Sequence, residues 1–317
     1  MTLLFLLGIL LFSLVLIKAA DITISSISRL SRETHAGSFL LSAIILAVGT
    51  SLPELFIGIT SSLGGSPNLS LGNVFGANIT NIALVSSLSA ILFKRIRVQG
   101  DIAKKDLGIA LVAGVVPFIF LVDGVISRVD GLVLLSIYGI YASSLFRARH
   151  EDVANKLLRQ ITVVGKSHYH DIGKLFLGIT LLLLSGEAIV RIANLVALNI
   201  NIPIFLVGLI ILSLGTTLPE LAFSIRSLTD HHPTMFFGNL LGSVIANSTL
   251  IVGIVAVISP IHVVVFDNYL VAFMAFVVSF LVFWFFTRTK HRLERWEALI
   301  LLLIYIAYVV VEFAIGR

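Results

Sequence analysis

Long apolar stretches run through this whole chain and restrict the class of structure that it can form. The clearest of them are residues 107–122, 131–145, 202–214 and 269–286. They approach or reach the roughly 20 residues that an α-helix needs to cross about 30 Å of hydrocarbon. Charged residues make up only 12% of the chain, which is about half of their share in a soluble domain. The sequence therefore predicts an all-α membrane protein.

About ten transmembrane helices are predicted from the apolar segments. They cover residues 2–19, 37–63, 69–93, 106–122, 130–147, 172–192, 202–228, 234–260, 265–287 and 296–314. The first segment could also be a signal peptide, because Lys18, Ala19 and Ala20 place small residues after an apolar run. No basic residue precedes that run, and it is longer than a signal-peptide core, so we expect a retained helix.

Basic residues gather in alternate loops between these segments. Even-numbered loops hold only Arg128 and Arg191. The odd-numbered loops hold all of the following: Lys18, Arg29, Arg32, Lys94, Arg95, Arg97, Lys104, Lys105, Arg147, Arg149, Lys156, Arg159, Lys166, Lys174, Arg288, Lys290, Arg292 and Arg295. Because basic residues accumulate on the cytoplasmic side, we expect a multi-pass protein of the cell membrane with both termini outside. This distribution accounts for the net charge of +5 without a nucleic-acid partner.

Two segments of the chain repeat at an offset of 166 residues. Residues 44–55, IILAVGTSLPEL, match residues 210–221, IILSLGTTLPEL, and residues 72–81 match residues 238–247. Five helices separate equivalent positions, so the two copies must lie in the membrane with opposite orientations. Inverted repeats with broken helices at the midplane are typical of secondary transporters. We predict a first five-helix repeat over 1–147, a short cytoplasmic linker over 148–171 and a second, inverted repeat over 172–317.

Polar residues within the repeated segments predict a cation site. Pro53 and Pro219 have no N–H for the carbonyl four residues earlier, and each is followed by a glutamate. Threonine and asparagine residues add hydroxyl, carbonyl and amide oxygens. The predicted central donors are Glu54, Glu220, Thr50, Thr216, Asn81 and Asn247. Ca²⁺ accepts six to eight oxygen ligands, whereas the lack of intramembrane histidine and cysteine argues against zinc or copper.

The two carboxylates carry a charge of −2, which one Ca²⁺ neutralises and which two or more Na⁺ can replace. An empty pair of buried carboxylates also favours taking up a proton. We therefore expect H⁺ to compete for the site, and H⁺ is the alternative to Na⁺ as the counter-ion. Alternatively, each glutamate could pair with a basic residue. No Lys or Arg lies near Glu54 and only Arg226 lies near Glu220, so the functional reading is preferred.

Three other polar groups have simpler expected roles. Asn73 and Asn239 are expected to hold helix ends. Glu187 and Arg191, four residues apart, are expected to form an ion pair near a membrane face. His231 and His232 are expected in a solvated turn.

The repeated motifs resemble those of the sodium/calcium exchangers of the cation/Ca²⁺ exchanger superfamily, prokaryotic type. The resemblance rests on residues 49–54, GTSLPE, on Gly72-Asn73-x-x-Gly76 and on their second copies. It implies a ten-helix fold and a central Ca²⁺ site formed by Glu54, Glu220 and the carbonyls of Thr50 and Thr216. It also implies electrogenic alternating access, with the first and sixth helices sliding past a rigid core. The flanking Na⁺ sites that it implies draw on Ala47, Ser51, Ser213, Thr217 and Ser243.

Two positions depart from the family pattern. Ala77 stands where the family usually has a serine, which removes a Na⁺ ligand, whereas its equivalent Ser243 is intact. Asn247 occupies a position that is Asp in some prokaryotic relatives and Asn in others. Both departures bear on which monovalent ion is coupled.

We therefore expect an antiporter that exchanges Ca²⁺ for Na⁺. The alternatives are a Ca²⁺/H⁺ antiporter, an exchanger of another divalent cation, and a cation channel. The Gly-Asn-x-x-Glu signature of the proton-coupled branch is missing. An enzyme is not expected, because the spans hold no nucleophile, base or metal-bound water constellation. The expected partners are metal cations and the lipid bilayer, with no cofactor, nucleic acid or obligatory protein partner.

Overall fold

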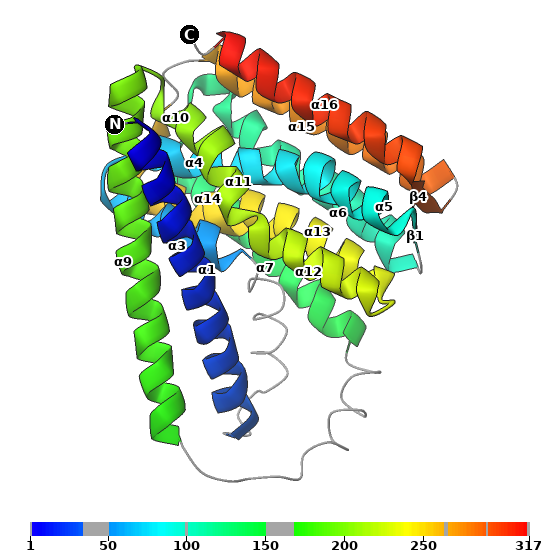
Figure 1. Cartoon of the computed structure of the whole chain (residues 1–317), viewed down its shortest axis with the longest axis horizontal. Helices are drawn as coiled ribbons and strands as arrows, with labels where there is room; N and C mark the ends of the chain where they lie inside the picture. Colours follow the sequence, from blue (N-terminus) through cyan, green and yellow to red (C-terminus); the bar gives the residue numbers. More distant parts are fainter. Residues whose placement is uncertain are drawn as a thin grey trace.

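The computed structural model describes residues 2–33, 51–98, 101–149, 168–262, 266–289 and 291–315, and these residues are overwhelmingly helical (Figure 1). Within these ranges, eight helices are long and apolar enough to cross a membrane, and Leu52–Leu63 is a shorter apolar helix. The chain is an all-helical multi-pass membrane protein, as predicted. Most of the predicted linker, residues 150–167, lies outside the described residues.

The helices of the first half precede residue 150. They are α1 (Thr2–Glu33), α3 (Leu52–Leu63), α4 (Pro67–Ile79), η1 (Thr80–Val85), α5 (Ser86–Phe93), α6 (Asp101–Phe120), η2 (Leu121–Asp123) and α7 (Arg128–Arg149). Those of the second half are α9 (His168–Ile200), α10 (Ile204–Leu206), η3 (Val207–Leu212), α11 (Ser213–Thr216), α12 (Leu218–Thr229), α13 (Pro233–Ile245), η4 (Ala246–Ile251), α14 (Val252–Ile258), α15 (Phe266–Thr289) and α16 (Arg295–Ile315). η1, η3 and η4 are π-helical, and η2 is a 3₁₀ turn.

The offset of 166 residues found in the sequence also relates the observed elements. α3 and α12 have the same length at this offset, and so do α4 and α13. The π-helical segments η1 and η4 also coincide. Because a π-helical turn is rare, its recurrence at equivalent positions indicates that the two halves share a backbone conformation as well as a motif.

The first helices of the two halves, α1 and α9, lie side by side along one edge of the molecule (Figure 1). A Cβ on Gly8 would lie 3.2 Å from Ile192 Cδ1, and one on Gly178 would lie 2.4 Å from Thr23 Oγ1. The residue numbers therefore run in opposite directions along the pair. Since α1 and α9 are equivalent elements, their antiparallel packing confirms that the repeats are inverted. Both helices extend beyond the predicted segments, and the apolar span of α1 ends at Thr23.

Two short ribbons join the halves. β1 (Arg95–Arg97) pairs antiparallel with β4 (Arg292–Glu294), and β2 (Val125–Ile126) pairs antiparallel with β3 (Ile261–His262). α6 connects β1 to β2 and α15 connects β3 to β4, so the ribbons lie at opposite ends of these spanning helices. The third and ninth loops thus meet at one membrane face, and the fourth and eighth loops meet at the other, which agrees with the partition of basic residues among these loops.

The halves are interlocked where α4 crosses α10 and η3. A Cβ on Gly72 would lie 2.1 Å from the Phe205 carbonyl oxygen, and one on Gly76 would lie 1.9 Å from that of Leu209. On the other side of the crossing, a Cβ on Gly208 would lie 2.2 Å from the Leu69 carbonyl oxygen. Backbones can approach this closely only where side chains are missing. The crossing thus brings the backbones of the two repeats into direct contact at glycines.

Candidate cation-binding site

Each candidate carboxylate lies in the first turn of a helix. α11 and α12 are separated by Thr217, and α3 starts directly after Ser51. The backbone angles of the residues that precede α3 and α12 are nearly equal, with φ −89° and ψ 10° at Ser51 and φ −85° and ψ 0° at Thr217. Proline suits the first turn of a helix, because a backbone N–H at that position would have no intrahelical partner in any case. The predicted interruption before the second glutamate is therefore confirmed.

Glu54 and Glu220 are brought together in the interior. Both side chains have 0% exposure, and their four carboxylate oxygens have no hydrogen-bond partner among the described residues. The two carboxyl groups are close enough for their charges to interact, and the Thr216 side chain lies beside Glu54. The partial positive charge of a helix N-terminus favours each carboxylate. Two buried carboxylates without protein partners are costly as bare charges, and a cation between them is a partner that this arrangement could accept.

Asn81 and Asn247 occupy the second position of the π-helical segments η1 and η4. Both are fully buried, and no described residue bonds either amide atom of Asn81 or the amide oxygen of Asn247. π-helical turns are often found at functional sites. Two amide oxygens thus remain available for a ligand in the same interior region.

Asn73 contacts the site, in contrast to the prediction that it holds a helix end. It lies inside α4, and its Oδ1 accepts a hydrogen bond from Thr216 Oγ1 at 3.2 Å. Asn239 likewise lies inside α13 rather than at its end. The prediction was wrong because the helices continue through both Gly-Asn motifs. Asn73 instead fixes the hydroxyl of a candidate ligand across the interface between the repeats.

Asn78 is a site residue that the repeat comparison missed. Its Oδ1 accepts a hydrogen bond from Asn247 Nδ2 at 3.2 Å, and its Nδ2 donates to Ser248 Oγ at 2.7 Å. The three buried side chains form a chain from α4 to η4. A comparison of the repeats passes over Asn78 because its equivalent is Val244. Its spacing of three residues from Asn81, which puts both on one helix face, was the available signal.

The remaining candidate ligands are hydroxyl groups with differing environments. Ser51 Oγ is buried with no partner among the described residues. Ser213 Oγ donates to the Leu209 carbonyl at 2.6 Å, and Thr217 Oγ1 donates to the Ser213 carbonyl at 2.9 Å. Ser243 is buried. These hydroxyls keep lone pairs for a cation, since a hydroxyl that donates can still accept.

Two predicted ligands, Ala47 and Thr50, lie outside the described residues. Within the described part of the chain, no three His, Cys, Asp or Glu residues cluster as a metal site. The candidate donor set instead consists of two carboxylates together with neutral amide and hydroxyl oxygens. Such a set suits hard cations such as Ca²⁺ or Na⁺ rather than zinc or copper.

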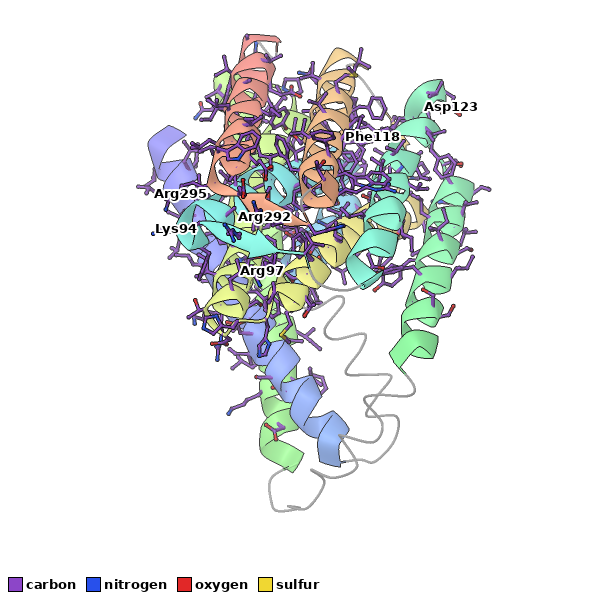
Figure 2. All side chains as sticks on the ribbon, turned by 90° about the vertical axis from the view of Figure 1, so that its right-hand side faces the viewer. Lys94, Arg97, Phe118, Asp123, Arg292 and Arg295 are labelled. Carbon is purple, nitrogen blue, oxygen red and sulfur yellow. The ribbon has the colours of Figure 1, made fainter. Side chains whose placement is uncertain are left out.

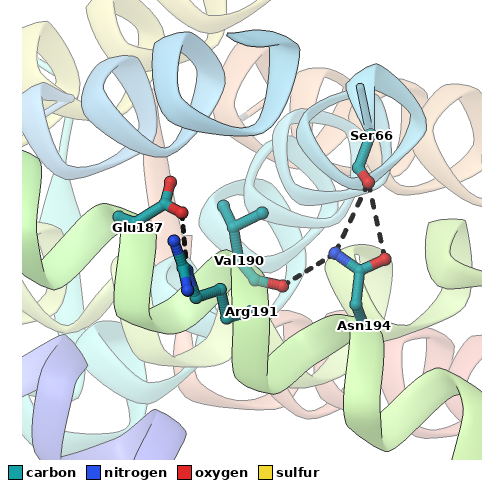
Figure 3. A network of polar contacts seen from close by, with 5 residues as sticks. All are labelled: Ser66, Glu187, Val190, Arg191 and Asn194. Carbon is teal, nitrogen blue, oxygen red and sulfur yellow. Dashed lines mark hydrogen bonds and ion pairs between the residues drawn. The ribbon is translucent and has the colours of Figure 1, made fainter. Parts of the chain in front are cut away.

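The structure shows the predicted ion pair, within the spanning segment Asp171–Ile200, and the predicted turn between α12 and α13. Arg191 Nε lies 2.7 Å from Glu187 Oε1, and Figure 3 shows this pair on one face of α9 beside the contact between Asn194 and Ser66. His231 and His232 are both exposed between α12 and α13. Neither feature contributes to the interior site.

Comparison with known proteins gives a family match over most of the chain. The model of a family described as sodium/calcium exchanger protein matches residues 4–147 and again residues 170–314. Among curated relatives, the inner membrane protein YrbG of Escherichia coli is 29% identical over 78% of this chain and 78% of its own length.

Two solved structures are similar along nearly the whole chain. The sodium–calcium exchanger NCX_Mj, soaked with Na⁺ and Sr²⁺, is 26% identical with a TM-score of 0.64 and covers 98% of this chain and 99% of its own. The H⁺/Ca²⁺ exchanger CAX has a TM-score of 0.74 but is only 19% identical, covering 98% of this chain and 87% of its own. The second likeness therefore concerns the fold alone.

Proposed function

Because the chain belongs to the sodium/calcium exchanger family, a family of cation antiporters rather than enzymes, we propose that it exchanges Ca²⁺ for Na⁺ by alternating access. The observation that carries this proposal is the pair of fully buried carboxylates, Glu54 and Glu220, whose oxygens have no partner among the described residues. One Ca²⁺ neutralises their charge of −2, and two or more Na⁺ can replace that ion. Exchange follows because Ca²⁺ and Na⁺ occupy the same site in turn, and each neutralises the charge of the two carboxylates.

The proposed Ca²⁺ ligands are the two carboxylates and oxygens of Thr216, Thr50, Asn81 and Asn247. The proposed Na⁺ ligands are Ser51, Thr217, Ser243, Ser213 and Ala47, the last through its backbone carbonyl. This assignment is supported by the burial and hydrogen bonding of the described members. It is also supported by the coincidence of the two helix starts and of the two π-helical turns.

The moving element in this proposal is the antiparallel pair α1 and α9. Their facing side chains form an apolar cluster separate from the main core, with Leu16, Ala19, Ile189 and Ala193 fully buried in it. Apolar contacts are non-directional, so such a pair can slide with few hydrogen bonds to break. The long contact between Asn194 of α9 and Ser66, at 3.4 Å, is one that must give way. Sliding exposes the site to one membrane face at a time, while the interlocked α4 and η3 stay in place.

We assign the face of the β1–β4 ribbon to the cytoplasm of a cell membrane, with both termini outside and with repeat boundaries at residues 147 and 172. Basic residues crowd the loops on that face. The relative YrbG is an inner membrane protein, which agrees with this location. A cysteine placed in the exposed turn at His231 would be labelled only from the cytoplasmic side.

Radiocalcium uptake into proteoliposomes tests the proposal. Vesicles are loaded with Na⁺, with K⁺, or with K⁺ under an imposed proton gradient, and the wild type is compared with Glu54→Gln. Glu187→Gln, which removes an exposed carboxylate from the same protein, is the matched control. We expect uptake that needs internal Na⁺, is absent in Glu54→Gln and is unchanged in Glu187→Gln.

Other outcomes identify the competing functions. Uptake driven only by the proton gradient would make the protein a Ca²⁺/H⁺ antiporter, in keeping with the missing hydroxyl at Ala77. Unitary currents in a planar bilayer would make it a channel. Full activity in Glu54→Gln would refute the proposed site itself.

A further inference from the structure

A pocket opens at the membrane face beside the β1–β4 ribbon. It has a volume of about 630 Å³ and is lined by Lys94, Arg95, Glu294, Arg295, Trp296 and Leu299. Its walls come from both halves of the chain, since β1 follows α5 and β4 precedes α16. Figure 2 views this face and shows Lys94, Arg97, Arg292 and Arg295 gathered around the ribbon.

The pocket carries an excess of positive charge. Of its three cations, Lys94 and Arg95 have no carboxylate partner among the described residues. Arg295 is held by two hydrogen bonds to the Ile91 carbonyl, at 3.0 Å from Nε and 2.8 Å from Nη2, which fix its position and leave its charge intact. The one acidic lining residue, Glu294, is already engaged, with Arg292 Nη2 at 2.7 Å and Trp296 Nε1 at 2.9 Å.

The pocket also lies where lipid headgroups lie. The spanning segment of α16 starts at Arg295, so the basic residues sit at the water–hydrocarbon boundary. Trp296 is 50% exposed there, as expected of a tryptophan at a membrane interface. Beyond it, Leu299 and Leu92 are 48% and 61% exposed and offer an apolar surface to acyl chains.

We infer that this pocket binds the headgroup of an anionic phospholipid. The phosphate lies among Lys94, Arg95 and Arg295, Trp296 lies against the glycerol region, and the acyl chains run along Leu92 and Leu299. Basic pockets between transmembrane helices on the cytoplasmic side recognise such headgroups. Because α5 continues the helix that carries Asn81, a lipid bridging α5 and α16 stabilises the end of a site-bearing helix.

Lipid titration of the intact protein in neutral detergent tests the inference. Short-chain phosphatidylglycerol, phosphatidylcholine of the same chain length and inorganic phosphate are each added, and apparent affinities are taken from the rise in Tm. We expect phosphatidylglycerol alone to stabilise at low concentration. Lys94→Gln with Arg95→Gln should weaken its binding about thirtyfold, from about 1 kcal/mol for each basic residue near the surface.

The matched control removes two charges from the same face outside the pocket. Arg226 and Arg288 are exposed and do not line it, so Arg226→Gln with Arg288→Gln should weaken binding by less than about threefold, because salt screens distant charges. Lys94→Arg with Arg95→Lys should retain binding, which separates charge loss from misfolding. Equal loss in both charge-removing variants would show diffuse surface attraction and overturn the inference. Equal stabilisation by phosphatidylcholine or by inorganic phosphate would overturn it as well.

Discussion

The two repeats contribute matching backbones but unequal side chains to the site. Helix starts and π-helical turns recur at the same offset, and Glu54 and Glu220 are equally buried. The asparagines differ. Asn247 is held by Asn78 at 3.2 Å, whereas both amide atoms of Asn81 lack a partner among the described residues.

The reason for this difference lies in two substitutions between the repeats. Val244 replaces Asn78 at the equivalent position, and Ile82 replaces Ser248, so the network around Asn247 has no counterpart around Asn81. The first repeat, which carries Asn81, also has Ala77 at the position where the second repeat has Ser243. The matching backbones thus place the candidate ligands alike in both repeats, whereas side-chain hydrogen bonds hold the candidate amide of only one repeat.

The largest expected effect tests whether the two carboxylates are equivalent. Glu54→Gln and Glu220→Gln should each reduce Ca²⁺ uptake at least about a hundredfold, because a buried charge left uncompensated costs about 3 kcal/mol or more. Initial rates of radiocalcium uptake measure this. Near-normal uptake in one of the two variants would show that only the other carboxylate contacts Ca²⁺.

The next effect concerns the crossing that locks the halves together. Gly76→Ala should destabilise the protein by about 2 kcal/mol through overpacking, since its Cβ would lie 1.9 Å from the Leu209 carbonyl oxygen. Gly139→Ala is the matched control, because no described atom lies within 4 Å of its Cβ and alanine favours a helix. Thermal unfolding in detergent should show a lower Tm only for Gly76→Ala. Equal Tm values would mean that the crossing can widen without cost.

Asn78→Ala breaks the asymmetry between the asparagines. Loss of its hydrogen bond frees the Asn247 amide to rotate. A hydrogen bond of this kind contributes about 1 kcal/mol, so the half-saturating Ca²⁺ concentration should rise about fivefold. Val244→Ala, at the equivalent position of the other repeat, should leave it unchanged. A similar rise in both variants would assign the effect to loosened packing rather than to orientation.

The smallest expected effect concerns the hydroxyl that one half lacks. Ala77→Ser should lower the Na⁺ concentration needed for half-maximal exchange about threefold, and Ser243→Ala should raise it by a similar factor. The factor corresponds to a contribution of about 0.7 kcal/mol from one neutral hydroxyl ligand. Exchange rates over a Na⁺ series at fixed pH measure both. If neither variant changes the Na⁺ dependence, these two positions do not contact Na⁺.

The fold was largely predictable from the sequence because its determinants are local or repeated. Apolar segments long enough to cross the hydrocarbon layer identify the spans. An odd number of helices between the repeated motifs requires inverted repeats, as the antiparallel pair α1 and α9 confirms. The site was predictable in part. Glu54 and Glu220 follow prolines in an apolar environment, a local signal, whereas the positions of Ala47 and Thr50 lie outside the described residues and stay predictions.

The sequence by itself determined the membrane class, the inverted repeats and the identity of the buried carboxylates, because hydropathy and self-similarity need no knowledge of contacts. Tertiary structure alone decided that Asn73 fixes Thr216 and that Asn78 fixes Asn247. These pairs join residues 143 and 169 positions apart, and their meeting depends on helices that cross at glycines. The angle and depth of such a crossing follow from side-chain packing across the whole interior, which no single segment encodes.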